Sequence, residues 1–475
     1  MMKFKKTKII ATLGPATSSK KMIEKLVKSG VDVLRINFSH AEHDDVKRLV
    51  NDVVEIRKRL NNHVTLLGDL QGPKIRISNV IENRNLQKNE KISLTTNFSI
   101  TNQNDIIGIN YPSFAKDIRA GENVLIDDGK IILKALSTDK KETVVLKVVQ
   151  PGLLKSKKGV NLPYTKISQP ALTEKDINDV IFAVKNAFDW IALSFVRSKK
   201  DVLELRELIS KHCDHHIPII SKIEKPQAIK KMDDIISVSN GIMVARGDLG
   251  IEIPAEEVPL NQKMLVSKCK KAGIPVIIAT QMMESMIDSL TPSRAEVNDV
   301  ANSVMDGADG IMLSGETSVG KYPCEVVKKI KDIILGVEDS HLITVSHKPP
   351  STKSDRIITK SICRNAATIA NEINAKAICT LTHSGYTGWQ ISSWRPNSLV
   401  IVFTSNKTVL TQLNLLWGVK CIYYNKFKST DSTVEEVNQL ALNEKYVKKG
   451  DFVINLAAMP IYEKGHVNTL RITKV

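Results

Sequence analysis

The chain has 475 residues, of which 42% are apolar, and a formal net charge of +17. This length exceeds what one compact core holds, so we expect two to four domains. We find no run of about 18 apolar residues, which argues against a membrane span. The basic start, Met1–Lys6, is followed by an apolar stretch too short for a signal peptide. We therefore expect a cytoplasmic protein without a membrane partner.

Lys and Arg number 68 against 51 Asp and Glu, an excess that suits either nucleic acid or small anionic ligands. The positive residues are scattered, and no basic run carries interleaved aromatic residues, so we expect no nucleic-acid partner. The six cysteines show no C-x-x-C spacing. In a chain of this size they are expected to be reduced thiols with a structural role.

Eight short segments rich in Ile, Val and Leu follow one another along the chain. Most lack polar alternation, which is typical of strands buried on both faces of a parallel sheet. The segments are Lys8–Leu13, Val33–Asn37, Val64–Asp69, Asp189–Ser194, Pro218–Lys222, Gly241–Ala245, Pro275–Ala279 and Gly310–Leu313.

Helical patterns lie between these segments. Ser18–Gly30 carries one apolar stripe and ends at a glycine. Thr173–Ala187 opens on Thr173 and Asp176, spaced as in a capping box, and Pro226 stands where a first helical residue tolerates proline. Strand and helix alternating eight times predict a (β/α)8 TIM barrel. An open, doubly wound sheet is the alternative, but the count of eight favours closure.

The connection between the third and fourth strands runs from Gln71 to about Gln169, far longer than an ordinary loop. Its segments predict a small inserted β-barrel, which can act as a lid over the mouth of the main barrel. They are Lys91–Thr95, Asn123–Ile126, Lys130–Leu133 and Thr143–Val149. We expect residues 1–70 and 170–341 to form the catalytic barrel and residues 71–169 to form the lid domain.

Residues 342–475 are expected to form a separate α/β domain. The region passes through a linker-like stretch, Lys348–Ser351, and then alternates between helix and strand. Its expected elements are a helix over Arg356–Asn374 and strands over Ala377–Leu381, Leu399–Phe403, Val419–Tyr423 and Phe452–Asn455.

Catalytic residues of such a barrel come from the C-terminal ends of its strands. One polar residue there would be read as a solvated loop residue, but here many converge on one mouth. They are Arg35, Asn37, Ser39 and His40; Asp69, Lys74 and Arg76; Lys222 and Glu224; Arg246 and Asp248; Thr280 and Gln281; and Ser314, Glu316 and Thr317. This convergence indicates an active site.

The residue types indicate the chemistry. Glu224 and Asp248 offer hard oxygen ligands suited to Mg²⁺ or Mn²⁺, and no His or Cys accompanies them as zinc would require. Arg35, Lys222 and Arg76 supply cations for a multiply charged anion. A divalent ion with convergent Arg and Lys, and without a Ser–His pair or a Cys nucleophile, indicates phosphoryl transfer. That reaction depends mostly on positioning and charge neutralisation.

Five longer motifs resemble signature segments of the pyruvate kinases, and they occur in the family's order. They are Val33–His40 (VLRINFSH), Ile219–Glu224 (IISKIE), Met243–Glu252 (MVARGDLGIE), Ala279–Met286 (ATQMMESM) and Met312–Thr317 (MLSGET). The resemblance covers essentially the whole chain. It implies transfer of the phosphoryl group of phosphoenolpyruvate to ADP, giving pyruvate and ATP, with Mg²⁺ or Mn²⁺ as the cofactor.

The resemblance implies roles for residues of the barrel. Arg35 is expected to hold the transferring phosphoryl group. Lys222 is expected to lie beside the bridging oxygen and to stabilise the transition state and the enolate. Glu224 and Asp248 are expected to bind the divalent ion, and the backbone at Gly247 to help hold the substrate.

Further roles follow from the same resemblance. Thr280, and Ser314 through water, are expected to line the proton path to the methylene carbon. A nucleotide, with a second Mg²⁺ on its phosphates, is expected to contact both the barrel and the lid. The residues implied are Asn37, His40, Arg76 and Lys158, with Asp128 as a weaker candidate for a lid contact.

One departure from the family pattern concerns K⁺. Members that need K⁺ usually carry Thr-Lys-Gly-Pro-Glu after a strand-ending aspartate, whereas this chain has Leu70-Gln71-Gly72-Pro73-Lys74. The positions equivalent to the K⁺ ligands are Asn37, Ser39, Asp69 and the backbone at Leu70. The chain resembles the subgroup that works without K⁺, since the Lys74 ammonium can supply the positive charge of the ion. We expect K⁺-independent activity.

The last domain contains a candidate effector loop, Thr382–Thr387, between a strand and a helix. Its hydroxyls, its glycine and the helix N-terminus can cradle a phosphate; an ordinary capped helix start is the alternative. The residues are Thr382, Ser384, Gly385 and Thr387. Because family members bind an activating sugar phosphate or nucleotide there, we expect allosteric activation by a phosphorylated metabolite. The resemblance also implies a homotetramer.

A second function stays open at this point. A Mg²⁺-dependent lyase or aldolase that works through an enolate could use the same barrel. The nucleotide-side residues Arg76 and Lys158 speak against it, because a lyase has no nucleotide to bind.

Overall fold

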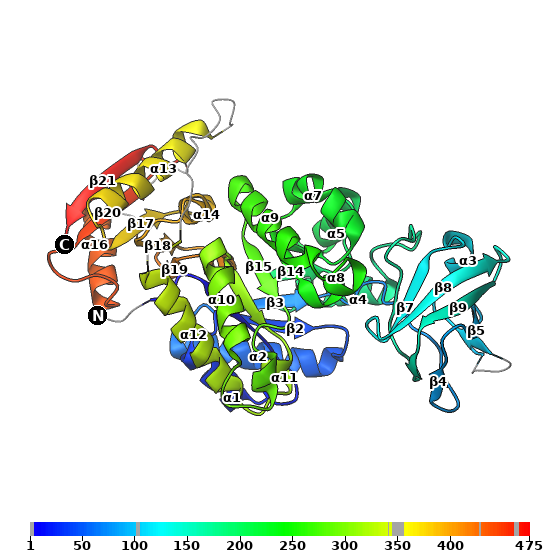
Figure 1. Cartoon of the computed structure of the whole chain (residues 1–475). Helices are drawn as coiled ribbons and strands as arrows, with labels where there is room; N and C mark the ends of the chain where they lie inside the picture. The colour runs from blue at the N-terminus through cyan, green and yellow to red at the C-terminus, as the bar shows by residue number, and fades with distance from the viewer. Residues whose placement is uncertain (1–3, 101–104, 341, 344–355, 427–428, 460–464) are drawn as a thin grey trace.

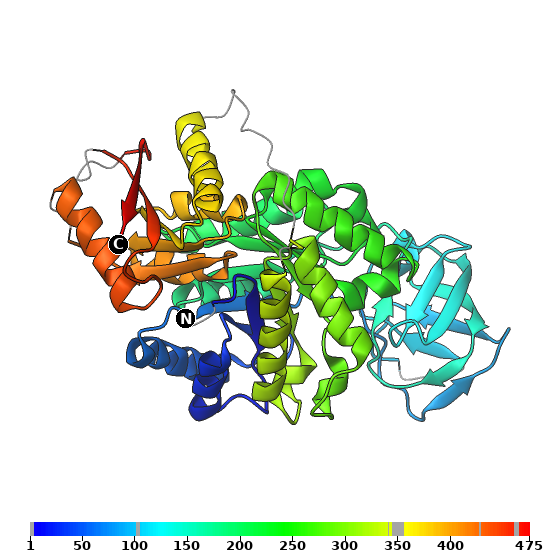
Figure 2. The ribbon, with the colours of Figure 1, turned by 60° about the vertical axis from the view of Figure 1, so that its left-hand side comes forward.

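The computed structural model describes residues 4–100, 105–340, 342–343, 356–426, 429–459 and 465–475. A barrel lies in the middle, a β-rich domain lies beyond one of its ends, and an α/β domain lies at the other (Figures 1 and 2). The linker-like stretch Lys348–Ser351 falls outside the described residues.

Eight parallel strands close into a barrel in the order β1-β16-β15-β14-β13-β12-β3-β2. Each strand is buried along nearly its whole length, as their continuous apolar sequences predict. The TIM barrel is therefore confirmed, and the open sheet is wrong, because β1 pairs with both β2 and β16. The strands are β1 (Lys8–Thr12), β2 (Val33–Asn37), β3 (Thr65–Asp69), β12 (Trp190–Leu193), β13 (Ile219–Ile223), β14 (Gly241–Ala245), β15 (Val276–Ala279) and β16 (Gly310–Leu313).

Helices surround the strands, and their ends follow the capping signals in the sequence. Ser19 caps the first helix, which ends at Gly30 with φ +121°, and Thr173 and Asp176 form a reciprocal capping box. The helical elements of the barrel are α1 (Lys20–Ser29), α2 (His43–Leu60), α4 (Glu174–Lys185), α5 (Lys199–His212), α6 (Pro226–Lys230), α7 (Met232–Val238), α8 (Arg246–Glu252), α9 (Glu257–Ala272), η1 (Glu284–Ile287), α10 (Arg294–Asp306), α11 (Gly315–Ser318) and α12 (Pro323–Asp339).

The insert between β3 and β12 is an all-β domain, as predicted. A six-stranded sheet in the order β11-β7-β8-β9-β5-β6 curves into a half-barrel, and β10 and β4 form a second, small sheet. Because β3 and β12 are neighbours in the barrel, the insert leaves and re-enters it at adjacent strands. Its elements are β4 (Arg84–Leu86), β5 (Lys91–Thr95), β6 (Ile106–Gly108), α3 (Phe114–Asp117), β7 (Asn123–Ile126), β8 (Ile131–Thr138), β9 (Thr143–Gln150), β10 (Gly152–Leu154) and β11 (Val160–Asn161). We call this insert the lid.

The C-terminal domain is a mixed sheet with helices. Strands β19, β18, β17 and β20 are parallel, and β21 adds to the edge in the antiparallel sense. The sequence did not predict β21. The elements are α13 (Ile357–Glu372), β17 (Ala377–Leu381), α14 (Tyr386–Ser393), β18 (Leu399–Thr404), α15 (Lys407–Gln412), η2 (Leu413–Leu415), β19 (Val419–Tyr423), α16 (Thr430–Asn443), β20 (Phe452–Ala457) and β21 (Thr469–Lys474).

The C-terminal domain closes the N-terminal end of the barrel. Leu415 of η2 joins the apolar cluster inside the barrel, together with Trp190 and Met243. Trp190 Nε1 donates to Gln412 O at 3.0 Å, and the buried Lys8 Nζ donates to Val419 O at 2.8 Å. The opposite, C-terminal mouth of the barrel faces the lid. Within the described residues, no helix is long and apolar enough to cross a membrane.

Candidate active site

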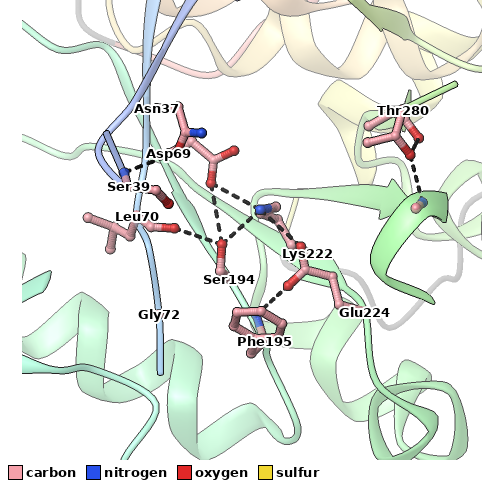
Figure 3. Close-up of polar contacts among 12 residues, drawn as sticks. Asn37, Ser39, Asp69, Leu70, Gly72, Ser194, Phe195, Lys222, Glu224 and Thr280 are labelled. Carbon is pink, nitrogen blue, oxygen red and sulfur yellow. Dashed lines mark hydrogen bonds and ion pairs between the residues drawn. The ribbon is translucent and has the colours of Figure 1, made fainter. Parts of the chain in front are cut away.

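Four charged side chains form one buried network at the C-terminal mouth of the barrel, and Figure 3 shows three of them, Asp69, Lys222 and Glu224. Arg35, at the end of β2, places Nε 2.7 Å from Asp69 Oδ2 at the end of β3. Lys222 of β13 places Nζ 3.2 Å from Asp69 Oδ1 and 2.9 Å from Glu224 Oε1. Cations and carboxylates therefore alternate, which allows charged groups to be buried together.

The network changes the proton affinities of its members. Burial opposes the charge on Lys222, but Asp69 and Glu224 outweigh it and raise the Lys222 pKa above its usual range. Burial likewise opposes ionisation of Asp69, yet Lys222 and then Arg35 lower its pKa. Burial, aided by the charge of Asp248, raises the pKa of Glu224 against the opposing effect of Lys222. The Lys222 ammonium therefore stays protonated at neutral pH.

Three further residues that the sequence analysis missed hold this network. Ser194 Oγ accepts from Lys222 Nζ at 2.8 Å and donates to Leu70 O at 2.7 Å. The backbone N–H of Phe195 donates to Glu224 Oε2 at 2.7 Å, and Thr12 Oγ1 accepts from Arg35 Nη1 at 2.9 Å. Thr12 and Ser194 lie at the ends of the first and fourth strands. The strand-end rule would have found them if it had been applied to those two strands.

Gly247 and Thr280 lie together on another side of the mouth. The N–H of Gly247, in the first turn of α8, donates to Thr280 Oγ1 at 2.7 Å. Thr280 has φ +71° and Gln281 has φ +55°, values that a side chain with a Cβ rarely adopts. Arg246 donates to the carbonyl of Thr280 at 2.8 Å, which helps to hold this strained turn.

Ser314 follows the adjacent strand, β16, and is the residue just before α11. Its N–H donates to Glu316 Oε2 at 2.7 Å, and Glu316 Oε1 accepts from Met283 N at 3.1 Å. Glu316 is buried and joins the loops after β15 and β16. These contacts explain Glu316 as a structural residue, whereas Ser314 remains partly exposed.

The carboxylates fit a hard divalent cation. Glu224 Oε1 is buried and forms no hydrogen bond within the described residues; its contact is the ion pair with Lys222. Asp248 lies in α8, which follows β14, and it lines the same cleft as Gly247. No group of three or more His, Cys, Asp or Glu gathers within the described residues. An ion here would therefore complete its coordination with substrate and water, as Mg²⁺ commonly does.

The lid supplies the other wall of the cleft, whose volume is about 720 Å³. Lys74 and Asp128 from the lid face Asp248 across it. Arg76 Nη1 donates to Lys157 O at 2.9 Å, and Lys158 Nζ lies 2.8 Å from Asp127 Oδ1. Both cations are thus held within the lid by its own residues.

His40 lies among cations on the barrel side. Partial burial and the charges of Lys74, Arg76 and Arg35 lower the His40 pKa. These three charges come from β2 and from the start of the lid. The surroundings of His40 therefore favour an anionic ligand.

The positions equivalent to the K⁺ ligands lie beside the network (Figure 3). Asn37 Oδ1 accepts from Ser39 N at 3.1 Å. Leu70 O accepts from Ser194, and Asp69 Oδ1 faces Lys222. Protein donors therefore already occupy part of this oxygen set.

The predicted effector loop lies in the C-terminal domain, at the far end of the barrel from the lid (Figure 1). Thr382 Oγ1 accepts from Gly385 N at 3.0 Å. Gly385 has φ +81° and precedes α14, and Thr387 is buried. The loop thus begins a helix, as predicted, but it takes no part in the barrel site.

Comparisons with known proteins agree on one family. The family model "Pyruvate kinase, barrel domain" matches residues 4–327, and "Pyruvate kinase, alpha/beta domain" matches residues 360–473. The chain belongs to the pyruvate kinase family. It is 40% identical over 472 residues to the pyruvate kinase of Geobacillus stearothermophilus and 37% identical over 469 residues to that of Staphylococcus haemolyticus. Each match covers 98% of this chain and 80% of the relative.

A solved structure supports the same assignment. The pyruvate kinase of Cryptosporidium parvum superposes with a TM-score of 0.92 at 34% identity, covering 99% of this chain and 96% of that one. The pyruvate kinase family has phosphoenolpyruvate and ADP as its substrates and typically uses Mg²⁺. The comparisons decide against the lyase alternative: the enzyme is a glycolytic kinase built on a TIM barrel.

Proposed function

We propose that the network around Lys222 is where the phosphoryl group of phosphoenolpyruvate passes to ADP. The observation that carries this proposal is the position of Lys222 Nζ, within 3.2 Å of Asp69, Ser194 and Glu224 at the mouth of the barrel. An ammonium fixed from three sides is ready to meet negative charge as it develops, without rearrangement.

Arg35 and Lys222 are proposed to contact different parts of phosphoenolpyruvate. Arg35 Nε and Nη1 are held by Asp69 and Thr12, which fixes the plane of the guanidinium. Its Nη2 has no hydrogen-bond partner among the described residues, and it can donate to the transferring phosphoryl group. Lys222 then stabilises the bridging oxygen as the enolate forms, while ADP attacks the phosphorus in line.

Glu224 and Asp248 would hold the divalent ion. When bound, the ion supplies positive charge for the carboxylate, the enolate oxygen and the phosphoryl group of the substrate. The protein's part is to aim the two carboxylates: Phe195 N fixes Glu224, and the first turn of α8 carries Asp248 next to Gly247. The Gly247 backbone then lies where it can help to hold the substrate.

The nucleotide would lie between the barrel and the lid. Asn37 and His40 face it from the barrel, and Arg76 and Lys158 from the lid; the second Mg²⁺ would come with its phosphates. Asp128 lines the same cleft as Asp248. In this scheme, residues 1–70 and 170–341 act as the catalytic unit, 71–169 as the lid and 342–475 as the regulatory unit.

Proton delivery completes the reaction. After phosphoryl transfer, the enolate needs a proton at its methylene carbon. Thr280 Oγ1 accepts from Gly247 N and donates to Ala279 O at 2.6 Å, so its hydroxyl is held at a defined position. We assign the proton path to Thr280, with Ser314 acting through water.

The main test is an assay of the purified protein with phosphoenolpyruvate, ADP and Mg²⁺, following pyruvate and ATP together. Wild type is compared with Lys222→Met, which keeps an unbranched side chain one atom shorter and removes the charge. We expect kcat to fall by about a hundred-fold or more, because a preorganised charge is lost. Equal rates for the two proteins would contradict the role of Lys222.

K⁺ independence is part of the proposal. Lys74 lines the cleft beside Asp248, where its ammonium can contribute the charge that K⁺ supplies elsewhere in the family. The oxygen atoms of Leu70 and Asp69 already face Ser194 and Lys222. The assay is therefore run without K⁺, and activity that appears only on adding K⁺ would contradict this part alone.

Regulation is proposed at the Thr382–Thr387 loop, through an activating sugar phosphate or nucleotide. A panel of such compounds at subsaturating phosphoenolpyruvate tests it; a rate that no compound changes would count against it. We also propose a homotetramer, which light scattering measures as four times the chain mass. As a glycolytic enzyme, the protein is proposed to act in the cytoplasm.

A further inference from the structure

The lid touches the barrel at α8, the helix that also carries Gly247 and Asp248. Asn161, on β11 of the lid, donates through Nδ2 to Glu252 Oε1 at 2.8 Å. Glu252 is the last residue of α8. A Cβ placed on Gly129, in the lid turn after β7, would lie 3.8 Å from Ile251 Cγ2. Two lid segments thus meet the same end of one short helix.

A buried lysine completes this contact. Lys225 Nζ lies 2.5 Å from the same Glu252 Oε1, and the two side chains are 7% and 0% exposed. Lys225 directly follows Glu224, the proposed ion ligand, and its ammonium lies 5.6 Å from the centre of the Phe195 ring. Phe195 in turn holds Glu224 through its N–H.

The carboxylate of Glu252 carries both bonds on one oxygen. Its Oε2 is buried and has no hydrogen-bond partner within the described part of the chain. A buried carboxylate with one unpaired oxygen depends strongly on the donors that remain. Losing either Asn161 or Lys225 therefore leaves a poorly compensated buried charge.

We propose that Glu252 and Lys225 are positioning residues for the nucleotide, acting through Asn161 to hold the lid at the distance that ADP binding needs. This inference deepens the proposed function, on which it rests for the nucleotide role of the lid. Lys158, three residues before Asn161, is the lid cation assigned to the nucleotide. We call the contacts of Glu252 with Asn161 and Lys225 the tie. The tie connects the lid segment that carries Lys158 to α8 and, through Lys225, to the segment that holds Glu224.

The tie acts on a conformational equilibrium and not on the reacting atoms. If it holds the lid in the competent position, breaking it lowers the fraction of enzyme ready for ADP. The apparent affinity for ADP then falls by that fraction. Phosphoenolpyruvate contacts the barrel side, so its KM should change little.

The test compares two changes at Asn161. Asn161→Asp places a second carboxylate against Glu252, and we expect the KM for ADP to rise about ten-fold or more, from the loss of one charge-assisted bond. Asn161→Gln keeps a side-chain amide that can donate to Glu252 Oε1 and leaves the ion pair of Lys225 and Glu252 in place. We expect the KM of Asn161→Gln for ADP to stay within about three-fold of wild type.

Controls separate the tie from general damage. Lys134→Ala changes an exposed lysine on β8 of the lid and should leave both KM values unchanged. Lys225→Met is compared with Lys230→Met, an exposed lysine at the end of α6; the first should raise the KM for ADP and the second should not. An equal rise in both substrates' KM values for Asn161→Asp would indicate structural damage and overturn the proposal.

A second measurement, amide hydrogen exchange, does not depend on catalytic activity. Amide hydrogen exchange in the nucleotide-free protein should be faster at β11 and α8 in Asn161→Asp and stay close to that of wild type in Asn161→Gln. Unchanged exchange and unchanged KM in Asn161→Asp, or equal changes in Asn161→Asp and Asn161→Gln, would overturn the proposal. A wild-type KM for ADP in Lys158→Ala would instead contradict the proposed nucleotide role of the lid, while exchange still reports on the tie.

Discussion

Ser194 Oγ lies 2.8 Å from Lys222 Nζ and 2.7 Å from the carbonyl oxygen of Leu70, so one hydroxyl connects the central ammonium to the loop that leads into the lid. The hydroxyl accepts from one group and donates to the other, and this fixes its orientation. Lys222 is thereby aimed by a neighbouring strand as well as by its two carboxylates.

Replacing the Ser194 hydroxyl tests how strongly catalysis depends on the orientation of the Lys222 ammonium. In Ser194→Ala we expect kcat to fall about ten-fold, since a hydrogen bond to a charged group is lost, while the KM for phosphoenolpyruvate changes much less. Ser210→Ala, at an exposed serine of α5, is the control. A rise in KM with an unchanged kcat would mean that Ser194 serves binding and not the transition state.

Gly72 provides a steric test of the lid connection. It has φ +69°, and a Cβ there would lie 2.8 Å from Phe195 Cδ2. In Gly72→Ala we expect the free energy of unfolding to fall by about 1 kcal/mol or more, and activity to fall because Phe195 holds Glu224. Gly121→Ala is a matched control, because Gly121 also has a positive φ (+93°) but a Cβ there meets nothing within 4 Å. Equal losses in chemical denaturation would contradict this explanation.

Mg²⁺ binding can be measured without substrate. Mg²⁺ should raise the melting temperature of wild type, by an amount that corresponds to about 2.7 kcal/mol at a hundred times its Kd. Glu224→Gln should abolish the rise, because one of two carboxylate ligands is lost. Glu284→Gln, at an exposed glutamate, should retain it. A shift of the same size in Glu224→Gln would place the ion elsewhere.

Lys74 gives a test of the monovalent ion. We expect Lys74→Glu to be weakly active without K⁺ and to regain activity when K⁺ is added, because the variant both loses a cation and gains an anion at the cleft. Lys74→Met removes the positive charge without adding a negative one. Its activity without K⁺ should therefore lie between that of wild type and that of Lys74→Glu. Rates measured in tetramethylammonium and in potassium buffers decide; identical ratios for wild type and Lys74→Glu would rule the role out.

Lys8 predicts a pH dependence of stability. Burial, with the charges of Lys420 and Lys5 adding to it and Asp32 opposing it, lowers the Lys8 pKa to about 7 from 10.5. Between pH 7 and 10.5, the unfolded chain holds this proton and the folded chain does not, so the free energy of unfolding rises with pH. Below pH 7 that gain is absent.

Lys8→Met removes this effect and leaves the other titrating groups in place. The difference in stability between wild type and Lys8→Met should therefore move in favour of wild type as the pH rises from 7 towards 10. Urea denaturation at a series of pH values measures it. A difference that does not vary with pH would mean that Lys8 titrates normally.

The sequence predicted the barrel well because its strands are buried on both faces and so are apolar throughout. The edge strand β21 was missed: its residues are partly exposed and mix apolar with charged side chains, and its antiparallel pairing with β20 is a long-range choice. Edge strands carry a weak local signal, because a neighbour on one side decides their pairing.

The central residues of the candidate site could also be predicted from the sequence. Strand-end positions and family motifs pointed to Lys222, Glu224 and Arg35, which the structure brings into one network. The bond from Asn161 to Glu252 had no local signal, since the two residues lie on different domains and each is unremarkable by type. Such contacts depend on how two domains meet, which no spacing in the sequence encodes.

The adjacency of β3 and β12 has a consequence for the order of folding. Leu67 and Trp190 are register partners although more than a hundred residues separate them in the chain. Closing a flexible loop of that length costs chain entropy, but a lid that is already folded brings its two ends together and shortens the effective loop. We therefore expect the lid to fold early during synthesis and to act as an internal clamp on which the barrel closes.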